Sequence, residues 1–138
     1  MTHGKTRLQV LCFFAHPDDD TFVAAGLICR YGAAGAACSL VTATRGDAGG
    51  RGDPPLCSRE AVPERREDDL RESATLLGIH HIHILDYHDK RLNDASAPNI
   101  RTELANIICR YRPHIVVTFD SNGMNGHPDH IAISRFTM

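Results

Sequence analysis

The sequence alternates along its whole length between short apolar runs and longer segments with apolar residues at helical spacing. Apolar runs of this length are typical of buried strands, and the longer segments of amphipathic helices. The expected strands are 7–14, 38–44, 79–85 and 113–119, and the expected helices are 21–31, 64–77, 99–111 and one from Pro128. Such alternation forms right-handed βαβ units. We therefore predict an α/β fold with a Rossmann-like, mostly parallel sheet and helices on both of its faces.

The length of 138 residues fits one domain, and neither a linker nor a repeat interrupts the alternation. We therefore treat 1–138 as a single domain. A formal net charge of -2 gives no electrostatic case for binding nucleic acid, so a small-molecule partner is expected. Residues 1–7 are polar and carry no signal-peptide pattern, and the first apolar run is too short to span a membrane. We expect a cytoplasmic protein without a membrane segment.

The cysteines agree with a reducing compartment. The sequence has 5 of them, an odd number, and no C-x-x-C pair. Cys12, Cys29 and Cys109 lie in apolar runs, where cysteine usually behaves as a small hydrophobic residue. We expect these three in the core.

Polar clusters follow each of the expected strands. In open parallel sheets, ligands bind beyond the carboxyl ends of the strands. The clusters are 16–20, 45–53, 86–89 and 120–130. We expect all four to meet at one rim of the sheet.

The first cluster contains A-H-P-D-D-D, from Ala15 to Asp20. Three carboxylates and an imidazole so close together repel one another and lose solvation unless a cation offsets them. A plainer interpretation is that Asp18–Asp20 only favour the N-terminus of the helix that follows. This motif alone leaves both interpretations open.

The last cluster contains G-H-P-D-H, from Gly126 to His130, and repeats the His-Pro-Asp triplet. His127 and His130 are three residues apart, so they lie on neighbouring positions if Pro128 opens a helix. Imidazole and carboxylate ligands with one open coordination position are typical of catalytic zinc sites. The alternative is that both histidines lie at the surface beside a turn.

Together these motifs resemble the PIG-L/LmbE-like N-deacetylases, whose usual motifs are AHPDDE and HPDH. T-R-G-D-A-G at 44–49 and R-x-x-D-x-x-x-S-x-x-x-L-G at 66–78 are similar to further motifs of that family, so the resemblance covers nearly the whole chain. It implies metal-dependent removal of an acetyl group from an N-acetylglucosamine-type or related N-acyl substrate. The ligand types suit Zn²⁺, and Fe²⁺ or another divalent metal as well.

The resemblance also implies a role for each motif residue. His16, Asp19 and His130 would bind the metal, and Asp18 would be the general base. His127 would stabilise the oxyanion or act as general acid. The sequence leaves the general acid open between Asp18 and His127.

Four further residues are assigned to substrate contact or to support of the metal ligands. Asp47 and Arg51 are expected to contact the substrate, although a solvated loop charge explains Arg51 equally well. Asp20 and Asp120 are expected to support the metal ligands from behind. Asp20 and Asp47 each stand where the family usually has Glu, which keeps the charge and shortens the reach.

Two rival functions remain. The chain ends eight residues after His130, whereas members of the family continue, so the resemblance implies truncation of the C-terminal part. A truncated chain could be a non-catalytic metal- or sugar-binding domain, or could complete its sheet in a homo-oligomer. A nucleotide-binding Rossmann protein is disfavoured, because 14–22 contains no glycine.

Overall fold

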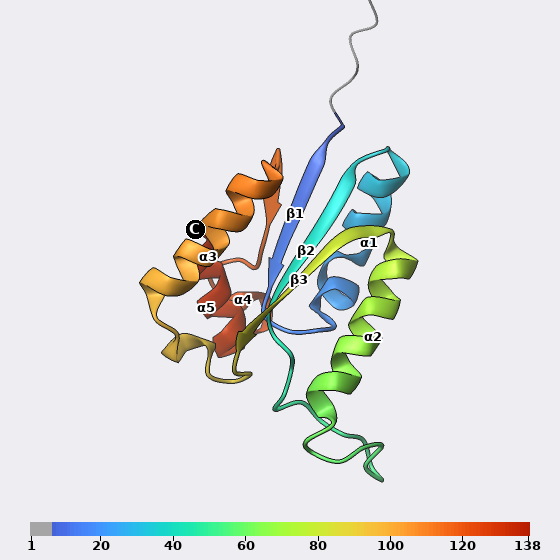
Figure 1. Cartoon of the computed structure of the whole chain (residues 1–138), viewed down its shortest axis with the longest axis vertical. Helices are drawn as coiled ribbons and strands as arrows, with labels where there is room; N and C mark the ends of the chain where they lie inside the picture. Colours follow the sequence, from blue (N-terminus) through green and yellow to red (C-terminus); the bar gives the residue numbers. More distant parts are fainter. Residues whose placement is uncertain (1–6) are drawn as a thin grey trace, which may run out of the picture.

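A computed structural model describes residues 7–138; the expectation for the first six residues lies outside this part of the chain. Four strands form one parallel sheet in the order β3-β2-β1-β4 (Figure 1). The strands are β1 Gln9–Phe14, β2 Ala37–Thr44, β3 Ile79–Tyr87 and β4 Ile115–Val117. The predicted α/β fold with a parallel sheet is confirmed.

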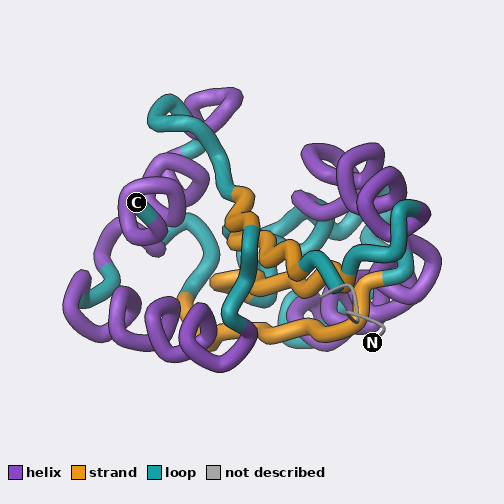
Figure 2. The backbone as a smooth tube through the Cα atoms, turned by 90° about the horizontal axis from the view of Figure 1, so that it is seen from above, coloured by secondary structure: helices purple, strands orange, loops and turns teal. Residues whose placement is uncertain are grey.

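Helices cover both faces of this sheet, as predicted (Figures 1 and 2). One face packs against α1 and α2, and the other against α3 and α5. The helices are α1 Asp19–Ala33, α2 Val62–Leu77, α3 Ala97–Tyr111, α4 Gly123–Gly126 and α5 Pro128–Thr137, with a short 3-10 helix, η1, at Leu92–Asp94. Among the described residues, no helix combines the length and apolar character that a membrane crossing requires.

The central strand β1 determines where the site lies. It pairs with β2 on one side and β4 on the other, with Val10 opposite both Cys38 and Ile115. Its apolar run is buried on both faces, as expected for a strand between two helical layers. The residues that follow β1 therefore emerge at the middle of the rim, where the backbone N–H of Thr44 donates to the carbonyl of Ala15 at 3.0 Å.

Some details differ from the expectations. Helix α1 begins at Asp19, two residues before the predicted 21, since acidic residues are favoured in a first turn. Strand β4 has three residues instead of the predicted 113–119. Cys12 is buried as expected, but the core prediction is wrong for Cys29 and Cys109, which are exposed on the solvent sides of α1 and α3.

Candidate metal and catalytic site

The four polar clusters meet at the rim of the sheet, as expected. His16, just after β1, places Nε2 3.0 Å from Asp129 Oδ2 of α5 and 3.1 Å from Asp89 Oδ1 after β3. Asp47, from the loop after β2, accepts a hydrogen bond from the backbone N–H of Asp89 at 2.9 Å. Segments far apart in the sequence are thereby joined around one imidazole.

Asp19 lies between the two imidazoles predicted to share a metal with it. Its Oδ1 is 3.3 Å from His130 Nε2, and its Oδ2 is 3.8 Å from His16 Nδ1. The three residues are buried, with exposed fractions of 9% for His16, 4% for Asp19 and 6% for His130. The backbone N–H groups of Ala15 and His16 donate to Asp19 Oδ2 and fix the carboxylate in this position.

The hydrogen bonds on the outer side of each imidazole determine where its lone pair points. His16 Nε2 faces carboxylates, and His130 Nδ1 is 3.2 Å from the carbonyl oxygen of Gly123. Because these partners accept hydrogen bonds, a neutral ring carries its proton on that outer nitrogen. The lone pairs of His16 Nδ1 and His130 Nε2 then face Asp19. Two imidazole nitrogens and a carboxylate arranged in this way fit a divalent metal such as Zn²⁺ or Fe²⁺.

The charge balance of the cluster points the same way. Burial works against a charged His16, but hydrogen bonds to Asp129 and Asp89 outweigh it and raise the pKa of His16 to about 9. Burial also raises the pKa of Asp19, against the opposing effects of the His16 backbone N–H and the imidazoles of His130 and His16. Both shifts favour uptake of positive charge by the cluster, whether it arrives as a proton or as a metal ion.

Asp129 and Asp89 lie in clusters that were expected at the rim, but the sequence analysis assigned no role to either residue. Asp129 is fully buried and accepts from the backbone N–H groups of Lys90 at 2.6 Å and Leu92 at 3.1 Å. These hydrogen bonds and that of His16 lower the pKa of Asp129, although burial acts to raise it. The signal was present in the sequence, because Asp129 is the aspartate of the second His-Pro-Asp triplet.

The structure also permits other metal-binding combinations. Ligand atoms of His16, His127 and His130 lie within 4.8 Å of one another, and so do those of His16, Asp89 and Asp129. In the second combination the carboxylates already accept backbone N–H groups. We therefore interpret Asp89 and Asp129 as anchors that orient His16.

Asp18 has an unusual backbone conformation at the edge of the cluster. Its φ of 103° lies in the left-handed region, which costs a residue other than glycine of order 1–3 kcal/mol. Arg66 Nη2, from α2, donates to Asp18 Oδ2 at 2.7 Å and to the carbonyl of Pro17 at 2.6 Å. Arg66 was part of the predicted helix motif, but its contact with Asp18 was not foreseen.

The loop after β2 wraps closely around Arg66. A Cβ atom at Gly46, where φ is +65°, would come within 2.5 Å of Arg66 Nε, and one at Gly49 within 2.7 Å of Arg66 Nη1. Larger residues at these positions would displace the guanidinium group. The two glycines thus allow Arg66 to reach Asp18.

His127 caps the start of α5. Its Nδ1 accepts a hydrogen bond from the backbone N–H of Asp129 at 3.1 Å, and its ring centroid lies 4.8 Å from those of His16 and His130. Burial, with the charges of His16 and His130, lowers the pKa of His127. A neutral His127 whose Nδ1 is an acceptor carries its proton on Nε2 and is a hydrogen-bond donor there.

Asp120 and Asp20 accept hydrogen bonds from residues other than the predicted metal ligands. Asp120 Oδ1 accepts from the backbone N–H of Met124 at 2.8 Å, in the turn whose Gly123 carbonyl receives His130. Asp120 therefore supports His130 indirectly. Asp20 accepts from the hydroxyl of Ser73 at 3.0 Å, which ties α1 to α2.

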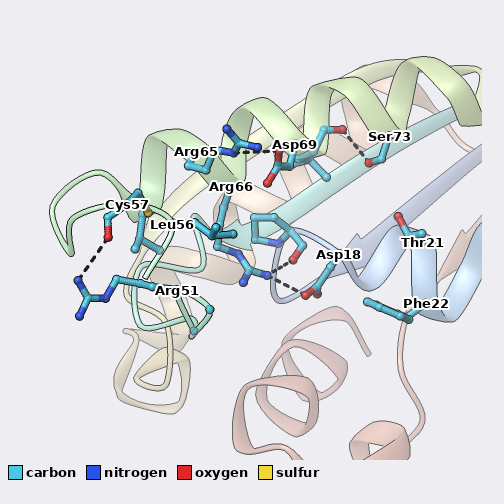
Figure 3. A pocket seen from close by; sticks show the side chains of 15 residues that line it. Asp18, Thr21, Phe22, Arg51, Leu56, Cys57, Arg65, Arg66, Asp69 and Ser73 are labelled. Atoms are coloured by element: carbon cyan, nitrogen blue, oxygen red, sulfur yellow. Dashed lines mark hydrogen bonds and ion pairs between the residues drawn. The ribbon is translucent and has the colours of Figure 1, made fainter. Parts of the chain in front are cut away.

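Two adjoining cavities border the cluster. The smaller, of about 210 Å³, is lined by His16, Asp18, Asp89 and His127 among others. The larger, of about 630 Å³, lies between α1, α2 and the loop after β2 (Figure 3). Arg51 lines this larger cavity and donates to the carbonyl of Cys57 at 3.3 Å.

Comparison with known proteins now identifies the family. A family model described as PIG-L, GlcNAc-PI de-N-acetylase, matches residues 11–138. The chain belongs to the PIG-L family. This confirms the resemblance on which the sequence-based roles rest.

Relatives of this PIG-L chain include named deacetylases. It is 36% identical to the 1D-myo-inositol 2-acetamido-2-deoxy-alpha-D-glucopyranoside deacetylase of Thermobifida fusca, over 94% of this chain and 53% of the relative. It is 32% identical to a probable N-acetyl-alpha-D-glucosaminyl L-malate deacetylase 2 of Bacillus anthracis, over 93% and 57%. The N,N'-diacetylchitobiose deacetylase of Pyrococcus horikoshii superposes with a TM-score of 0.81 at 28% identity, over 93% and 47%. The chain thus spans about half the length of these relatives.

Proposed function

We propose that this chain forms the metal-binding and catalytic part of a deacetylase that hydrolyses the acetamido group of an N-acetylglucosamine-type substrate. The observation that carries the proposal is the arrangement of His16 Nδ1 and His130 Nε2, whose lone pairs face Asp19 beside a cavity lined by Asp18 and His127. The names of the relatives support the substrate class. In the reaction, water adds to the amide carbon, the C–N bond breaks, and acetate and a free amine leave.

His16, Asp19 and His130 would hold the metal ion. A divalent ion bound there would polarise the amide carbonyl and lower the pKa of a water molecule toward about 7. Asp89 and Asp129 would keep His16 in the tautomer that presents Nδ1 to the ion, because both accept from Nε2. Zinc is the proposed metal, with iron as the alternative.

Asp18 would be the general base. It lines the smaller cavity with His16, and the hydrogen bond from Arg66 holds its carboxylate in place. After accepting a proton from water, Asp18 is the group that we propose returns a proton to the departing amine, since an amine anion is a very poor leaving group. His127, neutral and with its proton on Nε2, would then donate a hydrogen bond to the developing oxyanion.

Other assignments extend this proposal. Arg51 lines the larger cavity and is proposed to contact the substrate. Asp47 already accepts from the backbone N–H of Asp89, so its proposed substrate contact would use the remaining oxygen. Cytoplasmic localisation and homo-oligomerisation stay predictions.

The test combines metal analysis with release of primary amine from N-acetylglucosamine, its inositol glycoside and its malate glycoside. Asn tolerates a positive φ, so Asp18→Asn keeps the backbone while removing the base. We expect Asp18→Asn to lower kcat by about 10²–10⁴-fold and to leave the metal content unchanged. Asp94→Asn, at an exposed position in η1, is the matched control.

Three outcomes separate the alternatives. Metal retention and amine release that depend on Asp18 support the proposal. Metal retention without amine release from any substrate indicates a non-catalytic metal- or sugar-binding domain. A folded protein that retains no divalent metal at His16, Asp19 and His130 contradicts the proposal.

A further inference from the structure

The larger cavity adjoins the candidate catalytic site. Asp18, Gly50 and Arg66 line both cavities. Its volume of about 630 Å³ lies in the range of 300–1,000 Å³ that is usual for small-molecule pockets, whereas the smaller cavity is only about 210 Å³. A substrate whose acetamido group lies beside His16 and His127 would therefore place another of its groups in the larger cavity.

Four of the five charged side chains that line this cavity are paired with one another, and the fifth, Arg51, donates to the carbonyl of Cys57. Arg66 pairs with Asp18 at 2.7 Å, and Arg65 Nε lies 3.3 Å from Asp69 Oδ1 (Figure 3). Charged side chains that already have partners gain less from an ion in the ligand. The pairing therefore argues against an ionic group as the main determinant of binding here.

The exposed surface of the cavity includes two large apolar side chains. Phe22 of α1 is 81% exposed, and Leu56 of the loop after β2 is 86% exposed. Both line the cavity, and the Asp18–Arg66 pair lies between them in Figure 3. Val62 and Leu70 of α2 add buried apolar side chains to the same lining. Apolar surface concentrated at a cavity is typical of a binding site.

We infer that this cavity binds an apolar substituent of the N-acylated sugar, such as an alkyl or aryl group, and that Phe22 and Leu56 determine this preference. The inference rests on the proposed function and adds to it the chemical class of the substrate. The substituent can be attached at C1 as an aglycone or can be a longer chain on the nitrogen, and the same contacts would bind either.

The experiment compares kcat/KM for amine release in two pairs of compounds. One pair is the methyl and hexyl glycosides of N-acetylglucosamine; the other is methyl glucosaminide carrying an N-acetyl or an N-hexanoyl group. In one of the two pairs, we expect kcat/KM for the long-chain compound to exceed that for its short partner by about tenfold or more. Burying the added apolar chain against Phe22 and Leu56 has an effect of that order. The pair that shows the gain identifies the position of the substituent.

Variants assign the gain to the cavity. Phe22→Ser and Leu56→Ser should each bring the long-to-short ratio of kcat/KM toward one. Leu76→Ser is the matched control, because Leu76 is 82% exposed on α2 and does not line the cavity. It should leave the ratio as it is in the unaltered chain.

Failure of this inference can be told from failure of the proposed function. If methyl N-acetylglucosaminide is deacetylated but both ratios are near one, or if the two serine variants keep the gain, the inference is wrong and the proposed function stands. If the chain releases no amine at all, affinities of the same compounds measured by ligand-observed NMR replace the rates. Equal binding of the short and long compounds would then overturn the inference.

Discussion

The buried cluster around His16 and the cavity beside Phe22 reverse the usual distribution of polar and apolar groups. His16, Asp19 and Asp129 are polar and buried, whereas Phe22 and Leu56 are apolar and exposed. Burying polar groups is unfavourable unless they are hydrogen-bonded, and here backbone N–H groups and imidazoles supply the partners. The cluster is thus held rigidly by the sheet and α5, while the cavity is bounded on one side by a loop.

Two aspartates make the same kind of contact, with a basic side chain, in very different surroundings. Asp129 lies 3.0 Å from His16, with side chains 0% and 10% exposed. Asp69 lies 3.3 Å from Arg65, with side chains 59% and 69% exposed. Water screens the exposed second pair much more than the nearly buried first pair, so the energetic consequences of breaking them should differ greatly.

The largest effect is expected for Asp129→Ala. The change leaves the backbone N–H groups of Lys90 and Leu92 without their acceptor and removes the anchor of His16. An unpaired buried N–H costs about 1–3 kcal/mol, so we expect the free energy of unfolding to fall by about 3 kcal/mol or more. Metal affinity should fall by about 10–100-fold. Urea unfolding of the metal-free protein and competition with a chelator measure the two effects.

Two variants sharpen this prediction. Asp129→Asn keeps one acceptor oxygen and should cost less than Asp129→Ala. Asp94→Ala, at an exposed position, should change stability by less than about 0.5 kcal/mol. If Asp129→Ala lowers the free energy of unfolding no more than Asp94→Ala does, the cluster is not the rigid region inferred above.

Sequence patterns predicted the sheet and the convergence of the clusters because both depend on local periodicity. Strand β1 is apolar from Val10 to Phe14, and the polar residues after each strand had to emerge at one rim. The contacts of Asp89 and Arg66 were not predictable in the same way. Asp89 reaches His16 only through the pairing of β3 with β2, and Arg66 reaches Asp18 across a loop that two glycines keep narrow. Such contacts depend on tertiary geometry.

Side-chain exposure was also beyond local patterns. Cys29 and Cys109 stand in apolar stretches, but each lies on the outer side of its helix. Which face of a helix packs on the sheet depends on its rotation relative to its neighbours. The same limit applies to Phe22. Its position just after the metal motif did not reveal that its side chain would border a cavity.

An intermediate effect is expected from pH in the metal-free protein. The pKa of His16 is about 9 in the fold, against an ordinary value of 6.5. A raised pKa contributes stability that is full below 6.5 and is lost as pH rises through about 9. Asp129 affects stability in the acid range. Its lowered pKa contributes stability that is lost only as pH falls below the ordinary aspartate pKa of 3.8. We therefore expect Tm to decline between pH 6.5 and 9.

Cys12 and His127 have shifted pKa values that affect stability outside that window. Burial raises the pKa of Cys12 from 9.0 to about 12, so its contribution is lost only above 9. Because the pKa of His127 is lowered, this residue reduces stability only as pH falls below 6.5. Zinc bound at Nδ1 should replace the proton that a charged His16 carries there and so flatten the decline, as Tm measured with zinc and with chelator would show. An equal decline with and without zinc would contradict the assignment of His16 as a ligand.

The smallest effect is expected at the wall of the cavity. Asp69→Asn breaks the exposed pair with Arg65, and exposed pairs of this i,i+4 kind contribute about 0.3–0.5 kcal/mol. The free energy of unfolding should therefore change by less than about 0.5 kcal/mol, and less still at high salt. A double-mutant cycle with Arg65→Gln measures the pair directly, and a coupling above about 1 kcal/mol would contradict the contrast with Asp129. Because the pair adds so little to stability, its main effect is on the charge at the wall of the cavity. Asp69→Asn removes the carboxylate that pairs with Arg65. An anionic glycoside should therefore bind better to this variant than to the unaltered chain.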